Sequence, residues 1–147
     1  MSKVEGRCLC GCIGFEYNGS VNWIINCHCE TCRRATSSPM TTWISVPFSN
    51  FAFSRGQPAK YESSPGVVRR FCPSCGTPLS YESEKMPGEI HLYAASLLDP
   101  NSVEPTCHVF ESEKLAWFEV HDNLPRYATS RKGGTVAPDH IGPRGTS

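Results

Sequence analysis

Seven cysteines of this chain stand in short clusters whose spacing is typical of metal sites. The first cluster has the spacing Cys-x-Cys, the second places three cysteines within six residues, and the third has the spacing Cys-x-x-Cys followed by glycine. Thiolate sulfur is a preferred zinc ligand, and structural zinc is usually held by four ligands in a closed tetrahedron. The clusters are Cys8 and Cys10; Cys27, Cys29 and Cys32; and Cys72 and Cys75.

The first and third clusters together predict a closed, structural zinc site. Cys72 and Cys75 come from one tight turn, and Gly76 follows where the backbone must curl under the metal without a Cβ clash. Two more thiolates are needed, and Cys8 and Cys10 lie on one side of an extended segment. The free energy of metal binding would then add to folding. The alternative is a reduced thioredoxin-like pair in the third cluster, but no parallel βαβ pattern surrounds it.

The middle cluster predicts a second zinc site with an open position, because it supplies only three thiolates. Three protein ligands and one exchangeable position are the catalytic arrangement of zinc, in which water or substrate is polarised. A thiol such as glutathione would bind there as thiolate and be oriented to attack a carbonyl carbon. The predicted ligands are Cys27, Cys29 and Cys32.

A fourth protein ligand would instead make this second site structural. His28 is nearest, but the middle side chain of an extended Cys-x-Cys segment points away from its neighbours, so we place His28 outside the ligand shell. His91, His108 and His121 stay open as alternatives. An iron–sulfur protein is a further alternative, which visible colour would reveal.

Arg33 and Arg34 directly follow the middle cluster. A guanidinium there could offset the charge of three thiolates or hold a substrate carboxylate, and we assign the carboxylate to Arg33. The alternative is a solvated pair of arginines. Cys12 and Cys107 match no ligand pattern and are left unassigned, since a buried cysteine is often only a small apolar residue.

Composition excludes several functional classes. Lys plus Arg and Asp plus Glu number 14 each, so no basic field is available to attract nucleic acid. No stretch approaches the roughly 20 apolar residues of a membrane span, and the N-terminus lacks the pattern of a signal peptide. We therefore expect a cytoplasmic protein without nucleic-acid or membrane partners. Reducing conditions in that compartment favour metal-bound cysteines over disulfides.

The elements that must position these clusters are predicted to be mainly β. Alternating apolar residues and runs of β-branched and aromatic residues mark strands, and Gly and Pro separate them at intervals too short for long helices. Short helices are predicted over residues 30–35 and 111–117. The chain length predicts one domain over residues 1–129, followed by a disordered tail over 130–147 that is poor in apolar residues. The predicted strands are residues 13–17, 41–46, 67–71, 79–82 and 89–94.

Three segments resemble the glutathione-dependent formaldehyde-activating family, and the chain also resembles centromere protein V-type domains. The segments are Cys8-x-Cys10-Gly11-x-Ile13-x-Phe15, Cys27-His28-Cys29-x-x-Cys32-Arg33-Arg34 and Arg70-Phe71-Cys72-x-x-Cys75-Gly76-Thr77-x-Leu79. The likeness extends over residues 5–128 through Ser96-Leu97-Leu98-Asp99-Pro100, His108-Val109-Phe110, Trp117 and Leu124-Pro125-Arg126-Tyr127. Two departures are Cys12, where a small or apolar residue is usual, and residues 95–98, which lack the usual Gly and second acidic residue.

The resemblance implies a mainly β, zinc-stapled fold of small antiparallel sheets, like that of the Rab-binding chaperone superfamily, with two zinc ions per chain. It implies that the first and third cysteine clusters hold the structural zinc and that the middle cluster holds the active zinc, the same division as above. It further implies a carbon–sulfur lyase step, the reversible joining of formaldehyde and glutathione to S-hydroxymethylglutathione, with a small thiol and an aldehyde as partners. The alternative is a non-enzymatic, zinc-stabilised protein-binding module in which both zinc ions are structural.

Overall fold

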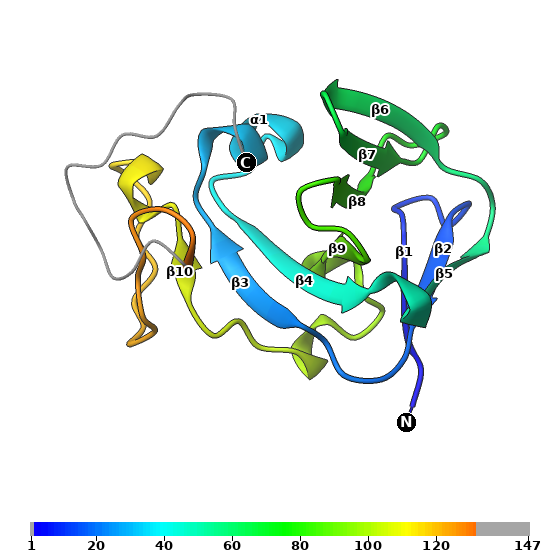
Figure 1. Cartoon of the computed structure of the whole chain (residues 1–147), viewed down its shortest axis with the longest axis horizontal. Coiled ribbons are helices and arrows are strands. Elements are labelled where there is room, and N and C mark those ends of the chain that lie inside the picture. The colour runs from blue at the N-terminus through cyan, green and yellow to red at the C-terminus, as the bar shows by residue number, and fades with distance from the viewer. Residues whose placement is uncertain (1, 132–147) are drawn as a thin grey trace. The chain divides into compact units, whose positions relative to one another are not determined.

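The computed structural model describes residues 2–131 of the chain (Figure 1). These residues divide into two compact units. Within the described residues, unit 1 comprises 2–23 and 44–103, and unit 2 comprises 24–43 and 104–131. The chain passes from one unit to the other three times: within strand β3 (Trp23–Cys27), within strand β4 (Thr41–Pro47) and between Val103 and Glu104. None of the helices in the described part has the length and apolar character needed to cross a membrane.

Unit 1 contains a three-stranded antiparallel sheet that carries the first cysteine pair. Its strands are β1 (Val4–Arg7), β2 (Gly14–Tyr17) and β5 (Phe51–Arg55), in the order β1-β2-β5. Phe15 is buried with its ring over Gly6, where a Cβ would overlap the ring. Glycine therefore allows β1 and β2 to keep this packing, and the loop between these strands holds Cys8 and Cys10.

Unit 1 also contains a run of four antiparallel strands that carries the second cysteine pair. Leu79, Ile90 and Leu92 are fully buried and form part of its core. The strands are β6 (Ala59–Ser64), β7 (Val67–Phe71), β8 (Pro78–Ser83) and β9 (Glu89–Tyr93), in the order β9-β8-β7-β6. The turn between β7 and β8 carries Cys72 and Cys75.

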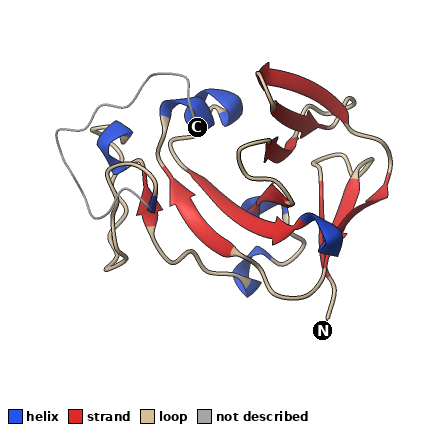
Figure 2. Cartoon of the chain, in the orientation of Figure 1, coloured by secondary structure: helices blue, strands red, loops and turns tan. Residues whose placement is uncertain are grey.

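Unit 2 places the three-cysteine cluster at the junction of strand β3 and helix α1 (Glu30–Thr36). Strand β10 (His108–Val109) pairs with β3 in parallel, with His108 opposite Asn26. The helix ends at Ser37, which adopts a left-handed conformation with φ of 58° and donates its N–H to the Arg33 carbonyl. Figure 2 shows that the helical segments of the described chain are short.

The structure confirms the mainly β class and each strand predicted from the sequence, within a residue or two at the ends. It also confirms the helix over residues 30–35. The parallel pairing of β10 with β3 corrects the expectation of antiparallel sheets alone. The single domain and the chaperone-like fold stay predictions, and the predicted tail lies outside the described residues except for 130 and 131.

The short helix predicted around residues 111–117 forms only in part. Only the 3-10 turn η4 (Glu111–Glu113) forms, with Glu113 N and Lys114 N donating to carbonyls three residues earlier, and the backbone leaves helical geometry at Lys114, where ψ is 143°. Glu111 N donates to Tyr127 O at 3.0 Å, and Phe110 N donates to Thr129 O at 2.9 Å. The other 3-10 turns are η1 (Phe48–Asn50), η2 (Ala94–Ser96) and η3 (Pro100–Ser102).

Candidate metal centres

The first candidate metal centre lies in unit 1, where the β1–β2 loop meets the β7–β8 turn. Its four sulfur atoms all lie within 4.8 Å of one another. The Sγ of Cys10 is 3.7 Å from that of Cys8 and 3.7 Å from that of Cys72. The structure therefore brings together the quartet that the sequence pairs, Cys8, Cys10, Cys72 and Cys75.

Backbone N–H groups of the β1–β2 loop and of the β7–β8 turn lie close to the sulfur atoms of the quartet. Cys75 N lies 3.4 Å from Cys72 Sγ, and Ile13 N lies 3.3 Å from Cys8 Sγ. The Thr77 hydroxyl, 3.1 Å from Cys75 Sγ, and nearby backbone N–H groups lower the pKa of Cys75 to about 5. Gly76 has φ of 80°, a conformation that side-chain-bearing residues rarely adopt. These contacts favour the thiolate form of Cys75, the form in which cysteine binds metal, whereas the pKa of Cys10 in the same quartet is raised to about 12.

The second candidate metal centre lies in unit 2 and contains three sulfur atoms. Cys27, Cys29 and Cys32 are all buried, with at most 5% of each residue exposed. Cys32 Sγ lies 3.5 Å from Cys27 Sγ. Within residues 2–131, no further Cys, His, Asp or Glu joins this group as a ligand. The trio could hold a metal ion with a coordination position left for another ligand.

Helix α1 orients the trio because Cys29 is its N-cap. The Sγ of Cys29 accepts a hydrogen bond from Cys32 N at 3.3 Å, the role that Ser, Thr, Asp or Asn usually fills. Hydrogen bonds with Cys29 and Cys32, together with burial, raise the pKa of Cys27 well above its ordinary value. The thiols of Cys27 and Cys29, whose pKa values are both raised, therefore resist ionisation, and a cation bound to them would reverse that preference.

Trp43 on β4 supports the trio, which the sequence did not indicate. Its indole Nε1–H donates to Cys32 Sγ at 3.4 Å, and the residue is 5% exposed. Donors of this kind orient a metal ligand and spread its charge. A strand tryptophan is more often a core residue, so its spacing gave no signal.

Replacing Trp43 with phenylalanine should weaken metal binding at the trio by about 10-fold or more, because the sulfur loses its donor while the ring is kept. Competition with a chromophoric chelator measures this affinity. Trp23→Phe is the matched control, because Trp23 packs edge-on against His91 instead. Equal affinities in wild type and Trp43→Phe would show that the indole does not support the metal.

The two arginines after the trio differ in their surroundings. Arg34 is exposed and pairs with Glu30 at 2.9 Å on the helix surface. Arg33 is partly buried, and its Nη2 donates to the Glu113 carbonyl at 3.2 Å. Its buried Nε makes no hydrogen bond to any described residue. Arg33 thus has a buried donor at Nε that is unpaired within residues 2–131, whereas Arg34 is a solvated helix residue.

His28 belongs to a third group in unit 2, together with His108 and Glu111. This agrees with the prediction that its side chain lies outside the ligand shell of the trio. Burial is the main cause that lowers the pKa of His28 to about 4. The groups that could hold a metal in residues 2–131 include neither His91 nor His121. The sequence named His108 only as an alternative ligand of the trio and gave no role to Glu111.

The remaining cysteines lie outside all three groups. Cys12 is exposed, and its carbonyl lies where a Cβ at Gly56 would clash, with Gly56 at φ of 72°. Cys107 is buried at 3% exposure. None of the nine cysteines forms a disulfide.

Comparisons with known proteins show which family and which fold the chain shares. The family model of the glutathione-dependent formaldehyde-activating enzymes matches residues 3–113. A protein of Schizosaccharomyces pombe named as an uncharacterized lyase is 34% identical over 96 residues, which span 59% of this chain and 64% of that protein. A crystal structure of a Rhodobacter sphaeroides protein has a TM-score of 0.56 at 23% identity, covering 69% of this chain and 91% of that one, and indicates a shared fold. The chain therefore belongs to the glutathione-dependent formaldehyde-activating enzyme family.

Proposed function

We propose that this protein is a zinc-dependent carbon–sulfur lyase that joins a small thiol to an aldehyde and cleaves the adduct in reverse. S-hydroxymethylglutathione, formed from glutathione and formaldehyde, is the adduct that the family suggests. The observation that carries the proposal is the division of seven sulfur atoms into a quartet and a separate trio. A quartet completes a tetrahedron, whereas a trio leaves a place for the substrate.

The sulfur distances fit zinc at both centres. A zinc–sulfur bond of about 2.3 Å gives sulfur–sulfur edges of about 3.8 Å in a regular tetrahedron. The edges between Cys8 and Cys10 and between Cys10 and Cys72 are both 3.7 Å. The edge between Cys27 and Cys32 is 3.5 Å. In either group, these sulfur–sulfur distances need to change by only a few tenths of an ångström to match those around a zinc ion.

The protein's own residues have separate roles in this proposal. Cys27, Cys29 and Cys32 hold the active zinc, which when bound supplies a Lewis acid that favours the thiolate form of an incoming thiol. Trp43 keeps the Cys32 sulfur in place through its indole N–H. Arg33 offers a guanidinium donor to a carboxylate of the thiol substrate. The quartet stabilises unit 1 and takes no part in the chemistry.

The activity itself is tested by the excess over the spontaneous reaction, since thiols and formaldehyde also combine without a catalyst. Exchange NMR on an equilibrium mixture of glutathione, formaldehyde and their adduct measures interconversion directly. We expect the purified, zinc-loaded protein to raise the exchange rate in proportion to its concentration. An exchange rate equal to that in buffer would contradict the proposed function.

The role of Arg33 gives a second prediction. Arg33→Gln should raise KM for glutathione by about 10-fold, the cost of roughly 1.4 kcal/mol for one lost charge-assisted hydrogen bond. A thiol without carboxylates, such as 2-mercaptoethanol, should be used equally well by variant and wild type. Arg34→Gln is the matched control and should leave both substrates unaffected. A loss that is equal for both thiols would show that Arg33 does not hold the carboxylate.

The alternative, a non-enzymatic binding module, is favoured by one observation in unit 2. Trp117 is 74% exposed, and large exposed aromatic side chains are frequent anchors at protein interfaces. In that case both zinc ions would have four fixed ligands, and added thiol would change neither site. The exchange experiment separates the two functions, because a module would leave the exchange rate unchanged.

A further inference from the structure

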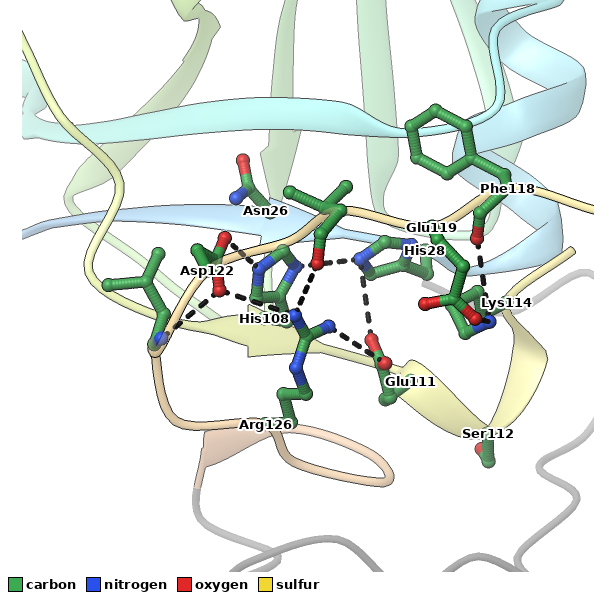
Figure 3. A network of polar contacts seen from close by, with 12 residues as sticks. Asn26, His28, His108, Glu111, Ser112, Lys114, Phe118, Glu119, Asp122 and Arg126 are labelled. Carbon is green, nitrogen blue, oxygen red and sulfur yellow. Dashed lines mark hydrogen bonds and ion pairs between the residues drawn. The ribbon is translucent and has the colours of Figure 1, made fainter.

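A buried polar cluster in unit 2 has no role in the proposed function. It joins the end of β3, strand β10, turn η4 and the loop that follows (Figure 3). His28 and His108 are both fully buried, at 0% exposure. The side chain of Glu111 is 12% exposed. Two imidazoles and a carboxylate from separate segments are costly to bury, because each polar group removed from water costs free energy.

Three atoms of this cluster face one another. His28 Nε2 lies 2.8 Å from His108 Nδ1 and 3.4 Å from Glu111 Oε2. With metal–ligand bonds of about 2.1 Å, neighbouring ligand atoms are about 3.0 Å apart in an octahedron and about 3.4 Å apart in a tetrahedron. The two distances therefore fall close to those of a coordination shell.

The second polar atoms of His108 and Glu111, which face away from this group, make hydrogen bonds of the kind found around metal ligands. His108 Nε2–H donates to Asp122 Oδ2 at 2.9 Å, which leaves Nδ1 unprotonated and directed at His28 (Figure 3). A ligand histidine commonly donates its other N–H to a carboxylate in this way. Arg126 Nη1 donates to Glu111 Oε1 at 2.9 Å. The second oxygen, Glu111 Oε2, is buried and accepts no hydrogen bond from any described residue.

We propose that His28 Nε2, His108 Nδ1 and Glu111 Oε2 form a further site for a divalent transition-metal cation, distinct from both cysteine clusters. The site has the His, His, carboxylate donor set that binds zinc or iron(II) with positions left open. On binding, the His28 proton moves from Nε2 to Nδ1, the other neutral tautomer, and the imidazole–imidazole hydrogen bond is replaced by two metal bonds.

The charged side chains around these three atoms carry a net negative charge. Glu111, Asp122 and Glu119 carry negative charge, and Arg126 and Lys114 carry positive charge. Arg126 Nη2 also contacts Asp122 at 3.2 Å, and Lys114 pairs with Glu119 at 3.0 Å. One negative charge remains uncompensated in this group, so a divalent cation is drawn to it.

Cobalt(II) added to protein whose cysteine sites are filled with zinc tests this site. We expect one equivalent to bind with weak visible bands, without the intense thiolate-to-cobalt charge-transfer absorption of a cysteine site, and to shift the ring NMR signals of His28 and His108. No cobalt bound beyond the dialysis blank would overturn the proposal. Cobalt bound only with thiolate absorption, and with unshifted histidine signals, would overturn it as well.

Variants then identify the ligands. Glu111→Gln and His108→Gln should lower cobalt affinity at least about 10-fold, and Asp122→Asn by about 10- to 100-fold because it orients a ligand. Glu119→Gln is the matched control, because its carboxylate lies in the same charged group but is 58% exposed and bound to Lys114. Its affinity should stay within about twofold of wild type, since exposed charges interact weakly. Equal losses in Glu119→Gln and Glu111→Gln would show general attraction without coordination and overturn the assignment of Glu111.

Discussion

Replacing Cys72 with serine is expected to cost about 5 kcal/mol or more of unfolding free energy, a large part of the total stability of a domain. Cys72 is fully buried, and its Sγ is one of the four quartet sulfur atoms, 3.7 Å from Cys10 Sγ. Serine cannot replace a thiolate as a zinc ligand, so the β1–β2 loop and the β7–β8 turn lose their connection. The variant should contain one fewer zinc ion per chain.

Urea unfolding and metal analysis together measure this effect. Cys107→Ala is the matched control, because Cys107 is similarly buried at 3% exposure but belongs to no cluster. Its loss should be about 1 kcal/mol, the ordinary cost of a small cavity. A Cys72→Ser protein with wild-type stability and wild-type zinc content would show that the quartet is not a structural zinc site.

Replacing Cys29 with serine is expected to abolish the catalysed exchange between thiol and adduct, with a loss of about 100-fold or more in the excess rate. Serine is itself a good N-cap, so its Oγ can accept the hydrogen bond from Cys32 N and helix α1 should form normally. The substitution thus removes one metal ligand with little effect on the local fold. Zinc should fall by one ion per chain, this time without the large loss of stability.

The comparison with Cys72→Ser separates the two centres. If the proposal is right, Cys29→Ser loses activity and keeps stability, whereas Cys72→Ser loses stability first. Cys107→Ala should keep both zinc ions and the full exchange rate. An unchanged excess rate in Cys29→Ser protein that has lost its second zinc would exclude the proposed mechanism.

Local sequence predicted the elements that hold the sulfur atoms better than it predicted their surroundings. The alternation at residues 13–17 and the β-branched run at 41–46 gave the strands directly, because side chains on a strand alternate between faces. The Cys-x-Cys and Cys-x-x-Cys spacings gave each short cluster because these spacings depend on short-range backbone geometry. The joining of Cys10 with Cys72, 62 residues apart, followed from counting the ligands that a closed zinc site needs. The helical segment at residues 111–117 is shorter than predicted because the backbone leaves helical geometry at Lys114, with ψ of 143°, which the local sequence did not indicate.

The polar groups around the candidate sites depended on tertiary contacts and could not be found in the sequence. Trp43 reaches Cys32 from a separate strand, and the spacing of 11 residues carries no periodic signal. His28 and His108 are 80 residues apart and meet only because β10 pairs with β3 in parallel. That pairing involves a two-residue strand, too short to recognise from composition.

The most direct test of the central claim is cadmium-113 NMR of protein reloaded with cadmium, whose chemical shift reports the number of thiolate ligands. A four-thiolate quartet and a three-thiolate trio predict two resolved sulfur-rich signals. Added glutathione should move the signal of the trio toward that of the quartet and leave the other in place. Two four-thiolate signals that both ignore glutathione, or a single sulfur-rich signal, would contradict the account.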